Sequence, residues 1–274
     1  MLTGHRVVVV GATGTIGRSI VSELLVAGSH VLATGRDAEM LAAIEHAGAD
    51  VLSLSLLPTE GCVQILRSAC AATFDDRVDG LVLATGVHGP IGPTRALPAE
   101  ALSTYLMEHF VSLIAIVGAL APLLDAARSP SIVALSGGGA TGPRPNYTAY
   151  AAAKVALIRA LENLALEEPR WRVNAVAPGF IASKIHESSI AADRGRSGED
   201  TEAIKAKLQE ADDPRQVARL VSLLLSDETA GLTGRLISAV WDDWDSKEWR
   251  REVARHPTLA RLRRDDRFDL RPQA

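Results

Sequence analysis

The stretch Arg6-Val7-Val8-Val9-Val10-Gly11-Ala12-Thr13-Gly14-Thr15-Ile16-Gly17 decides the fold. Its valine run is typical of a strand buried on both faces, and an amphipathic helix begins within the glycine-rich part and extends to about Ala27. The glycines allow a tight turn and the close approach of a pyrophosphate, while the start of the helix offers free N–H groups and a positive dipole end. Because the glycines lie between a strand and a helix, they predict a dinucleotide-binding turn.

Strand and helix patterns alternate through the rest of the chain. Six more apolar runs predict strands, at residues 30–34, 51–56, 80–84, 131–135, 173–177 and 235–240. Helices are predicted between them, at residues 38–47, 60–72, 98–128, 147–168 and 214–226. Repeated strand–helix units with short connections predict a single doubly wound α/β (Rossmann) domain whose parallel sheet of about seven strands is flanked by helices. We place this domain at residues 1–240 and a C-terminal extension at residues 241–274.

The extension differs in composition from the domain before it. It carries Trp241, Trp244 and Trp249, followed by a basic stretch at residues 261–264. Two interpretations stay open. The extension is either a solvated, partly frayed end, or an arm that packs on a neighbouring subunit or over the active site.

The composition of the 274-residue chain narrows its class. Hydrophobic residues make up 47%, enough for a substantial core, and the net charge of −4 gives no sign of a nucleic-acid binder. The first strand begins close to Met1 and no apolar run of membrane-spanning length is uninterrupted, so we expect no signal peptide and no membrane partner. We expect a cytoplasmic protein in which Cys62 and Cys70 are reduced thiols and no metal is bound.

The end of the second predicted strand bears on the choice of cofactor. An acidic residue there binds the ribose 2′-hydroxyl and selects NAD, but this chain has Gly35 at that point, followed by Arg36. A guanidinium suits a bidentate grip on a 2′-phosphate, which favours NADP and leaves NAD possible. The alternative is that Arg36 is an ordinary surface residue. Asp37 comes too late for the ribose and is expected to cap the next helix.

Tyr150 and Lys154 lie four residues apart in the predicted helix at 147–168, so their side chains share one face. A tyrosine side chain ordinarily ionises near pH ~10. A nearby ammonium favours the phenolate, lowers the pKa of the phenol and makes it a usable acid and base near neutral pH. The lysine can also hydrogen-bond a nicotinamide ribose. A tyrosine and a lysine at this spacing are common, and their meaning comes from the motifs around them.

Over residues 5–240 the chain resembles the short-chain dehydrogenase/reductase family. The motifs that carry the resemblance come in that family's order and spacing: the glycine turn, Ser136-Gly137-Gly138-Gly139, Tyr150 with Lys154, and Asn174-Ala175-Val176-Ala177-Pro178-Gly179. The resemblance implies that Tyr150 exchanges the proton at the reacting oxygen and that Lys154 lowers the pKa of Tyr150 and holds the ribose. A serine on the fifth strand is implied to hydrogen-bond the substrate carbonyl, while hydride passes between the nicotinamide and the carbonyl carbon.

The residues assigned to chemistry and to the cofactor lie at the ends of successive predicted strands and on the helix of Tyr150. The candidate catalytic residues are Ser136, Tyr150, Lys154 and His109. The candidate cofactor-binding residues are Gly11, Thr13, Gly14, Thr15, Ile16, Gly17, Arg36, Ser55, Ala84, Thr85, Gly86, Tyr150, Lys154, Pro178, Gly179, Ile181 and Ser183. By resemblance, the last four contact the nicotinamide carboxamide.

Several positions depart from the family's commonest pattern. The glycines run GxxGxxG rather than GxxxGxG, Leu83-Ala84-Thr85-Gly86 replaces Asn-Asn-Ala-Gly, and Ser55 replaces an acid that commonly touches adenine. His109 aligns with an asparagine that commonly holds a proton-relay water, so it is either a relay or a packed core histidine. The catalytic serine usually lies thirteen residues before the tyrosine, where this chain has Gly137. We assign the role to Ser136, which one extra residue in the loop would restore.

These observations predict an NAD(P)-dependent oxidoreductase that acts on a small carbonyl or alcohol. The main alternative is a catalytically silent dinucleotide-binding scaffold or sensor. A third hypothesis is an epimerase or dehydratase, but the chain after Pro178 is short for the substrate domain that such enzymes carry. The expected pocket segments at 86–95 and 138–147 show no cluster of charge, which indicates a neutral or weakly polar substrate.

The helices predicted at 98–128 and 147–168 are apolar around most of their circumference. One face of each helix can pack on the sheet, and the remainder would be exposed in a monomer. Because soluble monomers rarely expose a large apolar patch, we expect a homodimer or homotetramer in which these helices meet a symmetry mate.

Overall fold

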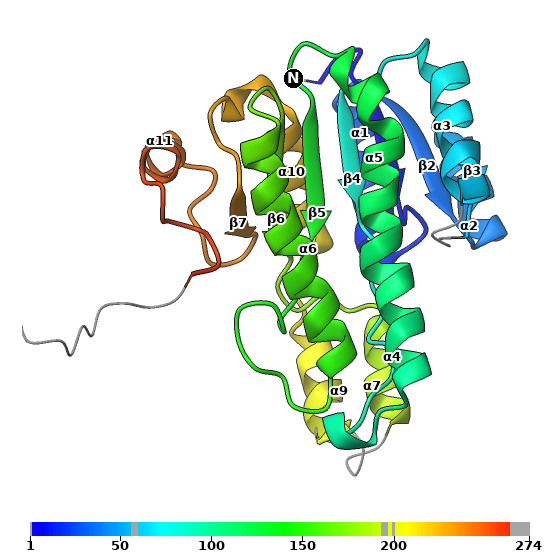
Figure 1. The fold of residues 1–274 in the computed structure, drawn as a ribbon, viewed down its shortest axis with the longest axis vertical. Helices are drawn as coiled ribbons and strands as arrows, with labels where there is room; N and C mark the ends of the chain where they lie inside the picture. The colour runs from blue at the N-terminus through cyan, green and yellow to red at the C-terminus, as the bar shows by residue number, and fades with distance from the viewer. Residues whose placement is uncertain (1, 56–59, 193–196, 199–200, 264–274) are drawn as a thin grey trace, which may run out of the picture.

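The strands expected from the sequence pair into one sheet in the computed structural model, which describes residues 2–55, 60–192, 197–198 and 201–263. Seven strands run parallel in the order β3-β2-β1-β4-β5-β6-β7 (Figure 1). Their bounds are β1 Arg6–Val10, β2 His30–Gly35, β3 Asp50–Ser53, β4 Gly80–Leu83, β5 Ser131–Leu135, β6 Arg172–Ala177 and β7 Arg235–Ser238. The predicted doubly wound fold is confirmed.

The sheet order reverses at β1, which pairs with β2 on one side and with β4 on the other. Val10, the last residue of β1, lies opposite Thr34 and Leu83, so these strands end at the same edge. In open parallel sheets a ligand binds outside the carboxyl ends of the strands at such a reversal. The topology therefore places the candidate site beyond Val10.

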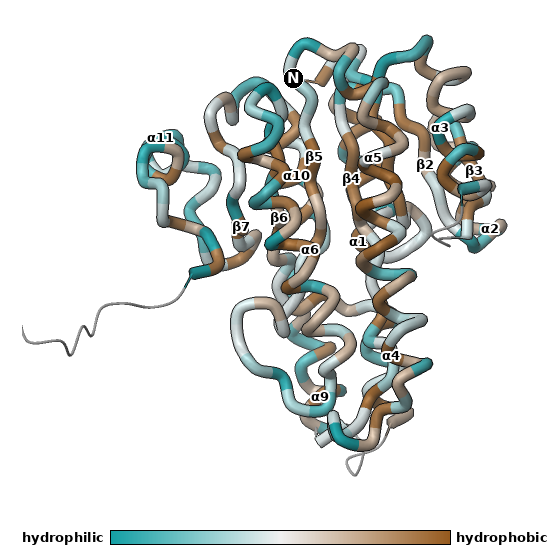
Figure 2. Tube along the Cα trace, viewed as in Figure 1, coloured by the Kyte–Doolittle hydropathy of each residue, from teal (hydrophilic) through white to brown (hydrophobic). Residues whose placement is uncertain are grey.

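Helices cover both faces of the sheet, and alternate valines of β1 serve the two layers. Val7 and Val9 pack with α1 (Thr15–Val26), α2 (Ala38–His46) and α10 (Pro214–Leu225). Val8 and Val10 pack with α3 (Glu60–Phe74), α5 (Ser112–Asp125) and α6 (Thr148–Glu167). Figure 2 shows apolar residues along the strands and apolar residues alternating with polar ones along the helices.

The long helix predicted at 98–128 is interrupted. It consists of α4 (Ala99–Leu106), one π-helical turn named η2 (Met107–Val111) and α5. The Ser112 hydroxyl donates to the Met107 carbonyl at 2.8 Å across this turn. By length and composition the 27-residue run Ala99–Asp125 could cross a membrane, but in this structure Leu113 and Leu120 pack into the core against the sheet.

The expectation that much of α5 and α6 is exposed in a single chain is wrong for most of their apolar residues. Those buried within the chain include Leu113, Ile116, Val117, Leu120, Leu123, Leu124, Leu157, Ile158 and Leu161. Phe110 and Ile114 are only partly buried, and Val155 and Leu166 are exposed. A homo-oligomeric contact through this face stays a prediction, with a smaller patch than expected.

Three shorter helices lie beyond the carboxyl edge of the sheet. Figure 1 shows α4, α7 (Ile185–Ala191) and α9 (Thr201–Gln209) together below the strands. The helices α7 and α9 contact each other, and α4 contacts α6. The polar segment after Ser183 thus includes a helix beyond the carboxyl edge, although residues 193–196 and 199–200 are outside the described ranges.

The described part of the C-terminal extension packs on its own chain. It forms α11 (Lys247–Arg255), and Trp244 is buried with its indole N–H donating to the Ala239 carbonyl at 3.0 Å. Beyond α11, the Leu236 amide donates to the Ala260 carbonyl at 2.8 Å, and the Leu262 amide donates to the Glu162 carboxylate at 2.9 Å. Residues 259–262 therefore lie against β7 and α6.

Candidate active site

The glycine turn between β1 and α1 leaves no room for side chains. Gly11 has a φ of +87°, and a Cβ there would lie 3.0 Å from the backbone of Ala84. A Cβ on Gly17 would lie 2.2 Å from the Gly11 carbonyl oxygen. Helix α1 begins after Gly14 with no side-chain cap, so its first N–H groups face outward as a phosphate-binding end. This backbone cradle fits a dinucleotide pyrophosphate.

The end of β2 has the arrangement expected from the sequence. A Cβ on Gly35 would lie 2.4 Å from the Thr13 side chain, so only glycine fits against the turn. Arg36 follows and is exposed. The Asp37 carboxylate accepts from the Met40 amide at 3.2 Å, which confirms that Asp37 caps α2. Arg36 is thus the charged residue next to the turn that remains available to a 2′-phosphate.

Lys154 joins the ends of two strands beside the turn. Its side chain is buried, and its Nζ donates to the Thr85 carbonyl at 3.0 Å and to the Leu135 carbonyl at 2.9 Å. Burial lowers the pKa of Lys154 to about 8. An ammonium has three N–H donors, so these two bonds leave one for another acceptor. The Thr85 hydroxyl is buried without a hydrogen-bond partner among the described residues.

Tyr150 is buried one helical turn before Lys154, and its hydroxyl lies against Gly137. A Cβ on Gly137 would fall 1.7 Å from the Tyr150 hydroxyl oxygen, so a serine cannot occupy position 137 while Tyr150 lies as it does. Burial raises the pKa of Tyr150, and the charge of the Arg144 guanidinium opposes that rise. The structure thus shows a cation near Tyr150 that the sequence argument did not consider.

Ser136, the assigned catalytic serine, is the first residue after β5. Its amide donates to the Val176 carbonyl at 2.8 Å, which holds the backbone between β5 and β6. Its hydroxyl is buried and has no hydrogen-bond partner among the described residues. Buried hydroxyls are normally bonded, so this one is a candidate donor to a ligand. It is Gly137, however, that lies at the Tyr150 hydroxyl.

His109 lies within the π-helical turn η2. Its ring is 4.3 Å from the Tyr105 ring, and its Nδ1 is buried without a hydrogen-bond partner among the described residues. Burial, followed by the charges of Lys154 and Arg36, lowers the pKa of His109 to about 4. His109 is therefore neutral near pH ~7 and has one ring nitrogen unused. Single π-helical turns are frequent at functional sites.

The remaining cofactor candidates follow β3, β4 and β6. Gly179 has a φ of +80°, and a Cβ there would lie 2.4 Å from the Asp212 carboxylate, which accepts from the Phe180 amide at 2.7 Å. This hydrogen bond to the Asp212 carboxylate was not expected from the sequence. Ile181 is buried and Ser183 partly buried, whereas Ser55 is exposed. Ala84 and Gly86 adjoin the carbonyl that binds Lys154.

Sequence reasoning missed a polar cluster next to Tyr150, which we call the His88 cluster: His88, Arg144, Tyr147 and Ser189. The His88 ring is 5.2 Å from the Tyr150 ring, and its Nδ1 is 2.8 Å from the Ser189 hydroxyl. The Tyr147 hydroxyl donates to Ser189 at 2.9 Å. Arg144 is the one charged member of this cluster, so the expectation of no cluster of charge in segments 86–95 and 138–147 is not contradicted by it. Arg144 was visible between Pro143 and Pro145, but no local pattern joins it to His88 or Ser189.

Comparison with known proteins adds sequence and structural relatives. A family model described as enoyl-(acyl carrier protein) reductase matches residues 11–239. The short-chain dehydrogenase/reductase cdmF of Talaromyces verruculosus is 27% identical over 267 residues, which cover 90% of this chain and 99% of that protein. A tropinone reductase homolog of Datura stramonium is 28% identical over 249 residues, with 86% of this chain and 90% of that protein covered.

A solved structure of similar fold comes from Pseudomonas aeruginosa PAO1. It is the NADPH-bound structure of a short-chain oxidoreductase that contains an atypical catalytic center. It superposes with a TM-score of 0.73 at 27% sequence identity, covering 87% of this chain and 97% of that one.

Proposed function

This chain belongs to the short-chain dehydrogenase/reductase family, and on that basis we propose that it is an NADP(H)-dependent oxidoreductase that interconverts a small carbonyl compound and its alcohol. The observation that carries the proposal is the buried pair of Tyr150 and Lys154 at the carboxyl edge, next to a glycine cradle that fits a dinucleotide. When bound, the nicotinamide supplies or accepts the hydride.

Tyr150 is proposed to move the proton at the substrate oxygen. In reduction its hydroxyl donates as the oxygen gains negative charge, and in oxidation its phenolate accepts the proton. The unpartnered hydroxyl of Ser136 is proposed to hydrogen-bond the same oxygen. His109, which is neutral and whose Nδ1 has no partner among the residues described, is proposed to pass protons toward Lys154 through water.

The cofactor is proposed to be held by the backbone of the glycine turn, by Arg36 at the 2′-phosphate and by the third N–H of Lys154 at the ribose. The choice of NADP over NAD rests on Arg36, which is exposed beside the turn, and on the absence of an acid at Gly35. The NADPH-bound Pseudomonas structure supports the same choice. NAD is the alternative cofactor.

The cofactor proposal is tested by titrating the protein with NADPH and with NADH. We expect tighter binding of NADPH, and we expect Arg36→Glu to weaken NADPH binding by about tenfold or more while NADH binding is kept or improved, because a bidentate contact to phosphate is lost. Arg95→Glu, on the short η1 helix (Thr94–Ala96), is the matched control and should leave the preference unchanged. Equal affinity of the unchanged protein for both cofactors contradicts the assignment.

The glycine at position 137 favours a second candidate, a dinucleotide-binding protein without catalysis, because the family's usual serine is absent there. The buried Tyr150 and Lys154 speak for the enzyme, since a scaffold needs neither. A protein that binds NADPH but consumes none of it with a broad panel of aldehydes and ketones would be the scaffold.

A further inference from the structure

The His88 cluster brings a cation to Tyr150 from outside the catalytic helix. Arg144 lies in the segment between β5 and α6, and the Cζ of its guanidinium is 3.8 Å from the centre of the Tyr147 ring and 5.9 Å from that of Tyr150. A guanidinium over an aromatic face is attracted by the electrons of the ring. Tyr147 thus supports Arg144 at a short distance from the ring of Tyr150.

His88 fixes the guanidinium from the other side. Arg144 Nη1 lies 3.1 Å from His88 Nε2, and because a guanidinium can only donate, Nε2 accepts. The proton of the neutral imidazole is therefore on Nδ1, which donates to the Ser189 hydroxyl at 2.8 Å. The His88 side chain is 1% exposed, and burial together with the charges of Arg144 and His186 lowers its pKa to about 3. His88 therefore stays an acceptor at neutral pH.

The groups that face Tyr150 come from several elements. Arg144 and His88 approach from the segments after β5 and β4, and Tyr105 from α4. Lys154 lies one helical turn further along α6. The Lys154 ammonium donates hydrogen bonds to two backbone carbonyls, and burial lowers its pKa to about 8. Burial raises the pKa of Tyr150, and it is Arg144 that opposes the rise.

We propose that Arg144 is a positioning residue of the active site: held by His88 and the Tyr147 ring, it stabilises the Tyr150 phenolate, a role that the family resemblance gives to Lys154. The inference rests on the proposed function. In reduction the Tyr150 O–H bond breaks, an O–H bond forms on the substrate oxygen, and the electron pair stays on the phenolate that Arg144 faces. The hydride comes from the proposed NADPH.

The test compares the pH dependence of kcat/KM for alcohol oxidation, which requires the phenolate and rises through the pKa of Tyr150. Arg144→Met removes the charge and keeps an apolar stem. We therefore expect the rising limb of the plot of kcat/KM against pH to move to higher pH by about one unit. Arg144→Lys should restore most of the shift. Arg159→Met, further along α6 and paired with Glu162, is the control and should leave the limb in place. NADPH affinity should change in none of them.

His88→Phe keeps a ring and removes the acceptor of Arg144, so it should move the limb in the same direction by a smaller amount. It also serves if Arg144→Met does not fold. An unmoved limb in both variants overturns the proposal. The proposal is also overturned if Arg144→Met raises KM but changes neither kcat nor the pH dependence of kcat/KM. That result would mean that Arg144 contacts an anionic part of the substrate.

A second readout separates this inference from the proposed function. Ionisation of Tyr150 is followed by tyrosinate absorbance, as the difference between the unchanged protein and Tyr150→Phe, and it needs no turnover. If the protein shows no NADPH-linked activity, the proposed function fails, while a titration that moves upward in Arg144→Met still supports the role of Arg144. A titration that stays in place overturns it.

Discussion

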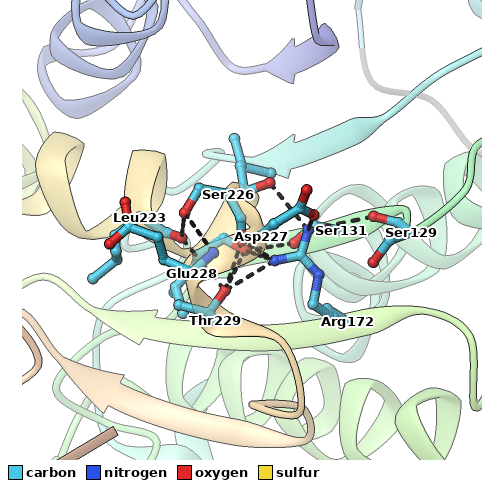
Figure 3. A network of polar contacts seen from close by, with 10 residues as sticks. Ser129, Ser131, Arg172, Leu223, Ser226, Asp227, Glu228 and Thr229 are labelled. Atoms are coloured by element: carbon cyan, nitrogen blue, oxygen red, sulfur yellow. Dashed lines mark hydrogen bonds and ion pairs between the residues drawn. The ribbon is translucent and has the colours of Figure 1, made fainter. Parts of the chain in front are cut away.

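The two edges of the sheet differ in the hydrogen bonding of their buried hydroxyl groups. At the amino edge, Arg172 at the start of β6 donates to the carbonyls of Ser129, Leu224, Leu225 and Ser226 and to the Thr229 hydroxyl (Figure 3). The hydroxyl of Ser131 at the start of β5 donates to the Leu224 carbonyl at 2.9 Å. At the carboxyl edge, the hydroxyls of Thr85 and Ser136 and the Nδ1 of His109 have no such partners in the part of the chain that the structure describes.

The ends of two helices show the same contrast. Arg172 satisfies carbonyls at the C-terminus of α10, where the helix dipole favours a positive charge. Helix α1 begins at the opposite, carboxyl edge, where its N-terminus carries the positive end of the helix dipole and has no side-chain cap. The contrast holds for hydroxyl groups: that of Ser131 at the amino edge is bonded within the chain, whereas those of Thr85 and Ser136 at the carboxyl edge lack partners among the described residues and are available to a ligand. It does not extend to every polar atom, because the Nε atoms of Arg172 and Arg235 at the amino edge also lack partners there.

The largest effect is expected for Tyr150→Phe. Removal of the proposed acid should lower turnover by about two to four decades, with little change in NADPH affinity or melting temperature. Tyr105→Phe is the matched control, because its hydroxyl donates to the Val87 carbonyl and should contribute to stability rather than to rate. Near-normal turnover of Tyr150→Phe would show that it is not the acid and would make Tyr147 the candidate.

At the amino edge the largest effect is expected on stability. Arg172→Met leaves several carbonyls without donors, so we expect the free energy of unfolding to fall by about 3 kcal/mol, while kcat of the folded protein stays unchanged. Denaturant titration measures the loss. Arg170→Met removes an exposed pair with Asp125 and should cost about 0–1 kcal/mol. A lower kcat in folded Arg172→Met would contradict the claim that Arg172 contributes to stability and not to catalysis.

Gly137→Ser tests whether the site tolerates the family's usual serine position. The new Cβ overlaps the Tyr150 hydroxyl, so Tyr150 must move, and we expect turnover to fall by about a hundredfold, a loss of roughly 2.7 kcal/mol in transition-state stabilisation. Gly138→Ala has open space at its Cβ and is the control. A Gly137→Ser variant that is as active as the unchanged protein, or more so, contradicts the geometry described above.

Two serines at opposite ends of β5 give the smallest and sharpest comparison. Ser131→Ala removes a bonded hydroxyl and should cost about 1 kcal/mol of stability with no change in rate. Ser136→Ala removes a hydroxyl that no described residue bonds, and it should lower turnover by about tenfold or more with little change in stability. Steady-state kinetics and thermal unfolding of both variants measure the difference. The opposite pattern would reverse the roles of the two edges.

The fold could be predicted because its signals are local. The valine run, the glycine turn and the repeated strand–helix spacing each act over a few residues, and the capping role of Asp37 follows from its place before α2. The shared location of the glycine turn, Ser136 and Lys154 also follows, because parallel strands bring their carboxyl ends to one edge.

The contacts that the sequence did not predict are made between distant segments. His88 meets Ser189 across 101 positions of the chain and Arg144 across 56, and neither distance leaves a periodic signal. The burial of α5 within its own chain could not be predicted for the same reason. An apolar helix pattern does not show whether the helix packs on its own chain or on another subunit. The π-helical turn at His109 depends on the local hydrogen-bond register of a helix whose sequence pattern is uninterrupted.

The central claim, that the carboxyl edge transfers hydride between a nicotinamide and a carbonyl, is tested most directly with NADPH deuterated at C4 of the nicotinamide. The protein is incubated with this cofactor and a panel of aldehydes and ketones, and the alcohols are analysed by mass spectrometry. The account predicts at least one alcohol with deuterium on the former carbonyl carbon, formed by the unchanged protein but not appreciably by Tyr150→Phe. NADPH that binds but never yields a labelled alcohol, or equal labelling by Tyr150→Phe, contradicts it.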